Sequence, residues 1–254
     1  MEYIDVIPGN VEEYGIFCIK DKKAPGYRQK VNWFKNKLNK GLRIILAINE
    51  AGKQSGFIEF IPSELAWRPI KASNYLFIHC IALFSKKDRN KAVGSHLIKL
   101  CEQEALRIGK DGVCVMTSTG PWMANSSIFK QNEYQEAERK DRFELFYKSF
   151  KNPAVKPRFT NWDKQIQNCK GWQLYYSNQC PWHFKSIEAI SRVAKQNKIS
   201  LKIIELQTPK QAQNGPSGYG TFALINNGTL LADHYISETR FKSILSKELK
   251  NNQS

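Results

Sequence analysis

The stretch from Tyr75 to Ala105, YLFIHCIALFSKKDRNKAVGSHLIKLCEQEA, decides the fold, because its periodicity changes across one short loop. Residues 76–84 form a nearly continuous apolar run rich in β-branched and aromatic residues, which predicts a buried strand. The residues that then recur at helical spacing are Leu97, Ile98, Leu100, Cys101 and Ala105. The basic loop 85–95 precedes the first helical turn, where unpaired N–H groups and the helix dipole favour an anion. The stretch therefore predicts a strand, a phosphate-binding loop and a helix.

The loop carries the residues Arg89-Asn90-Lys91-Ala92-Val93-Gly94. This run resembles the R/Q-x-x-G-x-G/A pyrophosphate loop of the GNAT family of acyl-CoA-dependent N-acyltransferases, with Ala92 at the first glycine position. The alternative is a surface turn with incidental basic residues. The resemblance implies acetyl-CoA as cofactor, bound by Ala82, Leu83, Phe84, Arg89, Asn90, Lys91, Ala92, Val93, Gly94 and Ser95.

Length and composition set the class of protein. The chain has 254 residues, of which 41% are hydrophobic and 12% aromatic, as in folded globular proteins. This length is enough for two modest domains. No apolar run approaches the roughly 18 residues of a membrane helix, and the start MEYIDVIPGN lacks the basic and apolar regions of a signal peptide. We therefore expect a cytoplasmic protein.

The net charge of +16 favours a nucleotide or polyanionic partner. Lysine and asparagine are spread over the whole chain, without a basic block or a stripe interleaved with aromatic residues. We therefore do not expect nucleic-acid binding.

The six cysteines, at positions 18, 80, 101, 114, 169 and 180, form no C-x-x-C pair and no zinc-ligand cluster. We expect neither a disulfide framework nor a metal site. Cysteines 18, 80, 101 and 114 lie in apolar surroundings and are interpreted as small buried hydrophobic residues.

The first 150 residues predict the order β-α-α-β-β-β-α-β-α-β-β, which is similar to that of a GNAT domain. Its strands are expected at 2–7, 42–48, 56–61, 76–84, 112–117, 136–139 and 142–148, and its helices near 11, after Pro25, after residue 95 and within 121–134. Alternation of Phe143, Leu145 and Tyr147 predicts a half-exposed last strand. The resemblance implies that the fourth and fifth strands splay apart around the cofactor's pantetheine arm.

Acyl transfer to an amine requires an oxyanion donor and loss of a proton from the amine. The resemblance implies a backbone N–H near Leu83 or Phe84 as the oxyanion donor. Glu59, His79 and Cys80 are candidate bases, among which the sequence does not choose; His79 has the most suitable ordinary pKa, and a core role for it is the alternative.

The acceptor side is expected along the second helix and the decorated loop 62–74. Tyr27, Trp33 and Phe34 are candidates for its wall, with the hydrophobic core as the alternative. Trp67 and Arg68 mark the loop as an edge of the acceptor pocket.

The segment 121–134, PWMANSSIFKQNEY, resembles a second GNAT signature that usually places a tyrosine near the cofactor thiol. Phe129 stands at the position of that tyrosine, and Tyr134 at the closing aromatic position. Since phenylalanine cannot protonate a thiolate, we expect no tyrosine acid at this position.

The C-terminal third predicts the order β-α-β-β-β-α, which resembles a trimmed thioredoxin fold, and its place after an acetyltransferase resembles the YoaP-like domain. Cys180 precedes a predicted helix, where the dipole lowers a thiol's pKa, and His183 would stabilise the thiolate. His183 replaces the second cysteine of C-x-x-C and Gly220 stands where a cis-proline is expected, so dithiol exchange is not expected. The alternative is a degenerate domain kept for binding or assembly.

Together these patterns predict an α/β (α+β) protein with a GNAT domain at 1–150, a linker at 151–168 and a YoaP-like thioredoxin-fold domain at 169–254. The function predicted is transfer of an acetyl group from acetyl-CoA to an amine of an unidentified acceptor. The alternatives are a thiol-dependent redox or sensing protein acting through Cys180, and a two-domain binding protein without catalysis.

Overall fold

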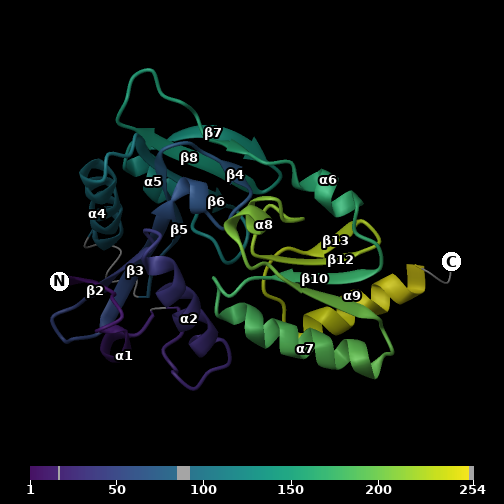
Figure 1. Cartoon of the computed structure of the whole chain (residues 1–254). Helices are drawn as coiled ribbons and strands as arrows, with labels where there is room; N and C mark the ends of the chain where they lie inside the picture. Colours follow the sequence, from purple (N-terminus) through teal and green to yellow (C-terminus); the bar gives the residue numbers. More distant parts are fainter. Residues whose placement is uncertain (17, 85–91, 252–254) are drawn as a thin grey trace.

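The computed structural model describes residues 1–16, 18–84 and 92–251 of the chain. Figure 1 shows two units that lie side by side, the first built on a seven-stranded sheet and the second on a four-stranded sheet. A mixed α/β architecture, as predicted, is therefore confirmed.

The first unit has the predicted order of elements, with two short elements, η1 and β4, added in the segment that was expected to be a loop. Its elements are β1 (Glu2–Asp5), α1 (Val11–Tyr14), α2 (Tyr27–Leu38), β2 (Arg43–Ile48), β3 (Gln54–Pro62), η1 (Ser63–Leu65), β4 (Ile70–Lys71), β5 (Tyr75–Leu83), α4 (Val93–Arg107), β6 (Gly112–Ser118), α5 (Ser127–Gln131), β7 (Gln135–Lys140) and β8 (Phe143–Ser149). The strand order is β1-β2-β3-β5-β6-β8-β7, and only the β5–β6 pair is parallel.

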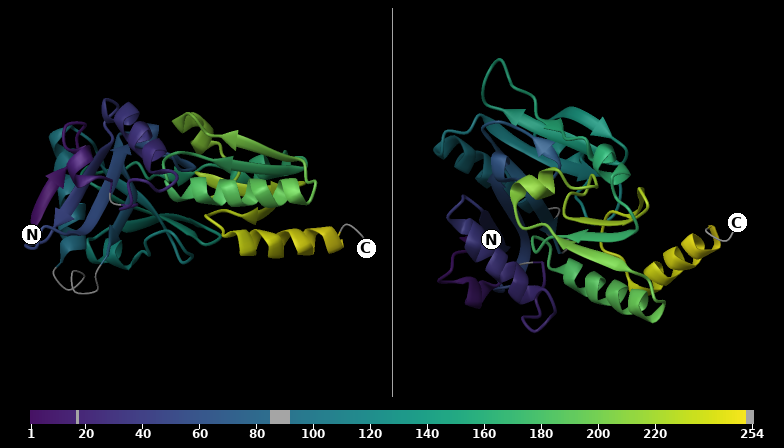
Figure 2. Two further views of the ribbon diagram at one scale, coloured as in Figure 1. Left: turned by 90° about the horizontal axis from the view of Figure 1, so that it is seen from below. Right: turned by 45° about the vertical axis from the view of Figure 1, so that its right-hand side comes forward.

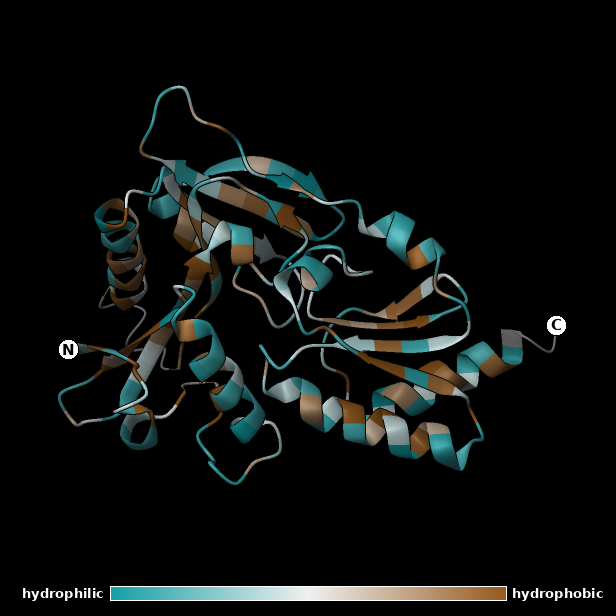
Figure 3. Ribbon diagram, in the orientation of Figure 1, coloured by the Kyte–Doolittle hydropathy of each residue, from teal (hydrophilic) through white to brown (hydrophobic). Residues whose placement is uncertain are grey.

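The second unit surrounds the smaller sheet, of strand order β11-β10-β12-β13. Its elements are β10 (Trp172–Tyr176), α7 (Trp182–Gln196), β11 (Leu201–Glu205), α8 (Pro209–Gln213), β12 (Phe222–Asn226), β13 (Thr229–Ala232) and α9 (Glu238–Asn251). β10 pairs with β11 in parallel and with β12 antiparallel. In Figure 3, α7 alternates hydrophobic and hydrophilic residues along its length, as expected for a helix with one buried face.

The large sheet is covered on both faces. On one face, α4 packs on β3, β5 and β6 through the cluster that contains Leu97, Ile98 and Cys101. On the other face, α2 covers β2 and β3 with Val31, Trp33 and Phe34. Tyr27, Trp33 and Phe34 are therefore core residues, which is the alternative that the sequence left open.

One hydrophobic cluster runs from the first unit into the second. It joins Phe143, Leu145 and Tyr147 of β8 to Leu174 of β10 and Phe222 of β12. The expectation of a half-exposed β8 is wrong, because residues 143–147 are all buried. The second unit covers the face that carries Phe143, Leu145 and Tyr147, and Phe146 on the opposite face packs in the cluster of α4. Figure 2 shows the resulting elongated body, with the two termini at opposite ends.

Residues 151–168, expected to be a linker, contain two regular elements. These are β9 (Arg158–Phe159), which pairs with β4, and α6 (Trp162–Gln167). Trp162 is 2% exposed and packs edge-to-face on Phe143 at a centroid distance of 6.0 Å. The segment was expected to be an interdomain linker, and burial of Trp162 holds it against the sheet.

Among the described residues, no helix is both long and apolar enough to cross a membrane.

Candidate active site

The parallel pairing of β5 with β6 ends halfway along β5. The registered pairs run from Tyr75–Gly112 to Ile78–Val115, whereas β5 continues to Leu83 and β6 to Ser118. The register of β5 against β3 also shifts at this point, between Glu59 and Phe60, which leaves His79 as the extra residue on β5. The two central strands therefore separate where the resemblance placed a pantetheine arm.

A cavity of about 440 Å³ lies over this opening, and both units line it. The first unit contributes Cys18, Phe57, Ile78, His79, Cys80, Ile81, Ala82, Phe84, Val115, Met116, Trp122, Met123 and Ala124, and the second contributes Gln179, Cys180, Pro181, Trp182 and Tyr219. Sequence reasoning found His79, Cys80, Ala82, Phe84 and Cys180 among these residues. It missed Gln179, Trp182 and Tyr219, because no pattern signals a contact across so many residues.

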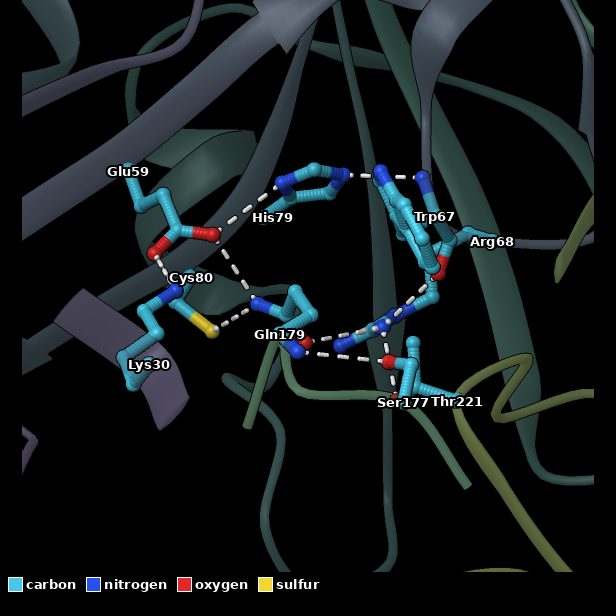
Figure 4. Close-up of polar contacts among 9 residues, drawn as sticks. All are labelled: Lys30, Glu59, Trp67, Arg68, His79, Cys80, Ser177, Gln179 and Thr221. Carbon is cyan, nitrogen blue, oxygen red and sulfur yellow. Dashed lines mark hydrogen bonds and ion pairs between the residues drawn. The ribbon is translucent and has the colours of Figure 1, made fainter. Parts of the chain in front are cut away.

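Glu59 is at the centre of a buried polar cluster behind this cavity (Figure 4). Its carboxylate accepts hydrogen bonds from Lys30 Nζ at 2.5 Å, His79 Nδ1 at 3.1 Å and Gln179 Nε2 at 2.9 Å. Burial alone would raise the pKa of Glu59, but the Lys30 ammonium and the two hydrogen bonds outweigh it and lower the pKa to about 2. Glu59 is thus ionised and hydrogen-bonded to three donors. These contacts make it a poor general base.

His79 has both ring nitrogens engaged. Its Nε2 accepts the Trp67 backbone N–H at 2.9 Å, so the proton of the neutral ring is on Nδ1 and is donated to Glu59. Burial lowers the pKa of His79 to about 4, against the opposing effect of Glu59. The basic lone pair is therefore occupied at neutral pH, and the geometry disfavours His79 as a general base.

Arg68 connects the loop 62–74 to the second unit. Its guanidinium donates to Thr221 Oγ1 at 3.1 Å and Gln179 Oε1 at 3.5 Å, and lies 4.9 Å from the Tyr219 ring centroid. Arg68 is 2% exposed, and no ion pair with a carboxylate is found for it in the described part of the chain. Arg68 thus contributes a positive charge beside the cavity that no carboxylate of the described residues neutralises. It is buried next to the lining residues and does not itself line the cavity, unlike the edge position expected from the sequence.

Gly220 permits this close approach. Its φ is +79°, and an added Cβ would lie 2.8 Å from Pro69 Cδ and 2.9 Å from Arg68 Cα. The glycine at the position of an expected cis-proline therefore has a packing role.

Three thiols line the cavity. Cys18 and Cys80, interpreted from the sequence as buried hydrophobic residues, are only partly buried, whereas Cys101 and Cys114 are buried as expected. Burial raises the pKa of Cys80, whose Sγ lies 3.8 Å from Gln179 Nε2. A protonated thiol is a poor proton acceptor, so Cys80 is not favoured as the base.

Cys180 and His183 do not form the expected thiolate pair. His183 is 1% exposed, and its Nδ1 donates to the Ser177 carbonyl at 3.1 Å. Burial lowers the pKa of His183 to about 3 and raises the pKa of Cys180 to about 11. Because the imidazole is neutral and the thiol protonated at neutral pH, thiol chemistry at Cys180 is disfavoured. Cys180 instead forms part of the cavity wall.

The expected cofactor loop is only partly described. Arg89, Asn90 and Lys91 lie outside the described residues. Ala92 has a left-handed conformation, with φ +54°, immediately before α4, which explains why a glycine suits this position in the family's pattern. Gly94 is buried, and an added Cβ would lie 2.5 Å from Ile128 Cδ1.

The N–H of Phe84 is not free to act as an oxyanion donor, because it donates to the Ser55 carbonyl at 2.9 Å. Of the two oxyanion donors expected from the resemblance, the N–H groups near Leu83 and Phe84, only an N–H of β5 such as that of Leu83 is left as a candidate.

The aromatic residues of the second signature are core residues. Phe129 is fully buried with its ring 5.5 Å from that of Tyr134, and burial raises the pKa of Tyr134 well above its usual range. Neither residue lines the cavity. No tyrosine acid is supplied from this segment.

No group of three or more His, Cys, Asp or Glu side chains suited to a metal ion is found within residues 1–16, 18–84 and 92–251.

Known proteins similar to this chain cover both units. A GNAT-family acetyltransferase from Staphylococcus aureus Mu50 aligns with 59% of the chain and 99% of its own length, at 18% identity and a TM-score of 0.42. A GNAT-family acetyltransferase from Brucella melitensis in complex with acetyl-CoA aligns with 63% of the chain and 94% of its own length, at 11% identity and a TM-score of 0.38. Likenesses at this level indicate neither substrate nor activity.

The sequence comparisons extend into the second unit. Residues 200–243 match the family model described as YoaP-like. The whole chain is 25% identical over 252 residues to the "Uncharacterized N-acetyltransferase YoaP" of Bacillus subtilis (strain 168), which covers 97% of this chain and 99% of that protein. The chain is thus similar, over nearly its whole length, to a YoaP protein named as an N-acetyltransferase.

Proposed function

We propose that the protein transfers an acetyl group from acetyl-CoA to the amine of an acceptor. The observation that carries this proposal is the separation of β5 from β6 beyond Ile78 and Val115, under a cavity that reaches both strands. Such an opening admits the thioester end of a long, thin cofactor between two strands. The name of the Bacillus subtilis relative, which spans both units, agrees with this assignment.

We further propose that the pyrophosphate of coenzyme A binds at residues 89–95, which include the first residues of α4. Backbone N–H groups at this helix start supply hydrogen bonds and the positive end of the dipole. Ala82, Leu83 and Phe84 would lie along the arm of the cofactor, since Ala82 and Phe84 line the cavity. An acetyl donor agrees with the name of the Bacillus subtilis relative, which is that of an N-acetyltransferase.

The division into units remains part of the proposal. We propose an acetyltransferase unit at 1–150 and a second unit at 169–254 that is thioredoxin-like, on the strength of its parallel β10–α7–β11 and antiparallel β12–β13 arrangement. A cytoplasmic location stays a prediction.

The direct test is release of free thiol from acetyl-CoA in the presence of an amine panel, with the N-acetylated product identified by mass spectrometry. Binding of acetyl-CoA is measured separately by calorimetry. We expect micromolar binding, on the order of −8 kcal/mol, and amine-dependent thiol release. Absence of acetyl-CoA binding would remove the proposal.

A further inference from the structure

None of the described residues that line the cavity carries charge at neutral pH. Its titratable lining residues are Cys18, His79, Cys80, Cys180 and Tyr219. Burial raises the pKa of each of the three thiols and of the Tyr219 phenol, and lowers the pKa of His79. All five are therefore uncharged, and the lining residues that the structure describes include no carboxylate.

The charges directly behind the wall add up to a positive value. Lys30 and Arg68 are cations, Glu59 is an anion, and all three are at most 2% exposed. Glu59 is bound by Lys30, His79 and Gln179, so it cannot turn toward a ligand without breaking buried hydrogen bonds. A cationic amine would lose its hydration and meet a net positive charge, which makes its entry unfavourable.

The remaining wall is apolar and rich in aromatic rings. Trp122 and Trp182 lie with ring centroids 6.0 Å apart at one side, and Phe57, Met116 and Tyr219 complete the lining. A cavity of about 440 Å³ must also hold the thioester end of the cofactor, so the space for the acceptor suits a single ring rather than a peptide or a polyamine.

We propose that the acceptor is a small aromatic amine that enters as the uncharged base, and that the second unit selects it by closing the cavity with Gln179, Trp182 and Tyr219. This inference rests on the proposed acetyl transfer. Because the amine arrives without its extra proton, the site needs no general base.

The reaction then balances without a further reactant. The amine lone pair attacks the thioester carbonyl carbon, and a C–N bond forms. The C–S bond breaks and its electron pair leaves on sulfur. The nitrogen becomes positively charged when the C–N bond forms, and one of its own two protons passes to this thiolate, directly or through water, to give the amide and free coenzyme A.

The test compares two isomers, benzylamine and 4-methylaniline, which have the same atoms but differ in charge at neutral pH. Benzylamine is then almost wholly an ammonium ion, whereas 4-methylaniline is uncharged. For benzylamine, kcat/KM should rise about tenfold per pH unit below its own pKa, because only the uncharged fraction reacts. For 4-methylaniline, kcat/KM should change less than about twofold over the same range.

Binding to the enzyme–coenzyme A complex separates recognition from chemistry. At neutral pH, 4-methylaniline should bind at least about tenfold more tightly than benzylamine, or about 1.4 kcal/mol. A pH-independent kcat/KM for benzylamine, or tighter binding of its ammonium form, would overturn the inference and leave acetyl transfer standing. If no amine caused thiol release from acetyl-CoA at any pH, the proposed function itself would be overturned.

A matched pair of variants tests the role of charge in the wall. Met123→Glu places a carboxylate in the lining, and Met123→Gln adds the same shape without charge. Only the Glu variant should gain benzylamine turnover at neutral pH, by about tenfold. An equal gain in the Gln variant would show that charge does not exclude the cation.

Discussion

At the scale of single residues, Gly94 is the most sensitive position of the proposed cofactor loop. Gly94→Glu should abolish acetyl-CoA binding, because a carboxylate at the start of α4 repels the pyrophosphate. Gly94→Gln is the control, since it has the same size and meets Ile128 in the same way. Calorimetry with both variants, after circular dichroism has shown intact folding, separates charge from bulk. Equal affinities of the Glu variant and the unaltered protein would contradict a phosphate site here.

Phe129 offers a second residue-scale prediction. Phe129→Tyr should change kcat by less than about tenfold, or 1.4 kcal/mol, since the ring is buried outside the cavity and coenzyme A thiolate is a good leaving group. The added hydroxyl should lower stability by about 1–3 kcal/mol if no partner is found for it. Tyr134→Phe is the control, because the Tyr134 hydroxyl has no hydrogen-bond partner among the described residues. A rise in kcat well beyond tenfold in Phe129→Tyr would show that a missing acid limits the reaction.

The two buried histidines predict a loss of stability in acid. The pKa of His79 is lowered to about 4 and that of His183 to about 3, from an ordinary value of 6.5. Below pH 6.5 the unfolded chain therefore binds protons that the folded chain does not, and the free energy of unfolding falls as pH falls toward those folded-state values.

Each histidine should contribute a slope of up to about 1.4 kcal/mol per pH unit. Glu59, with its pKa lowered from 4.5 to about 2, adds a further loss only below pH 4.5. Urea unfolding at several pH values between 6.5, where the histidines begin to contribute, and 4.5, where Glu59 begins to contribute, measures the slope. His183→Gln should reduce it by one histidine's share, and an unchanged slope would show that His183 is not kept neutral.

At the scale of elements, the turn before β12 determines how closely the two units approach. Gly220 and Gly228 both have positive φ, +79° and +76°, but only Gly220 faces Pro69 and Arg68 across the interface. Both Gly→Ala variants should cost about 1–2 kcal/mol for the left-handed backbone. Gly220→Ala should cost more, because its Cβ clashes where that of Gly228 has no neighbour closer than 3.7 Å. Thermal unfolding compares them directly; equal midpoints would mean that the interface yields without cost.

The order of elements was predictable because helices and strands follow local periodicity. The strands predicted at 42–48, 76–84 and 112–117 appeared within one residue of their predicted bounds. The errors share one cause. The burial of Trp162 in residues 151–168 and the pKa of Cys180 depend on packing between the units, and the burial of Phe146 in β8 depends on packing against α4. No sequence window contains both partners of any of these contacts.

The candidate site shows the same limit. Glu59, His79 and Cys80 were candidates because they were expected on or beside the wall of the acceptor site, and the fold does bring Glu59 and His79 into contact. Their roles could not be read, since they depend on Lys30 and Gln179, which lie 29 and 120 residues from Glu59 in the chain. The charge of a site is a property of the fold, whereas its residue types belong to the sequence.

At the scale of the whole molecule, the shared cluster predicts that the units are not independent. A chain of residues 1–150 would expose Phe143, Leu145 and Tyr147, each at most 4% exposed in the whole protein. We expect this fragment to be insoluble or to bind a hydrophobic dye, whereas the full chain should unfold in one transition by both fluorescence and circular dichroism. A soluble fragment with native-like acetyl-CoA affinity would show that the first unit folds alone.

The closure of the cavity by Tyr219 has a consequence for synthesis in the cell. A ribosome synthesises the first unit before the second, at about 5–20 residues per second. Tyr219 is therefore the last of the described lining residues of the cavity to leave the ribosome. The nascent chain must keep the apolar side of β8 covered, by chaperones or by the ribosome surface, until β12 emerges. The proposed acetyl transfer therefore begins only after Tyr219 has left the ribosome, so that a chain terminated before β12 yields no partly competent enzyme.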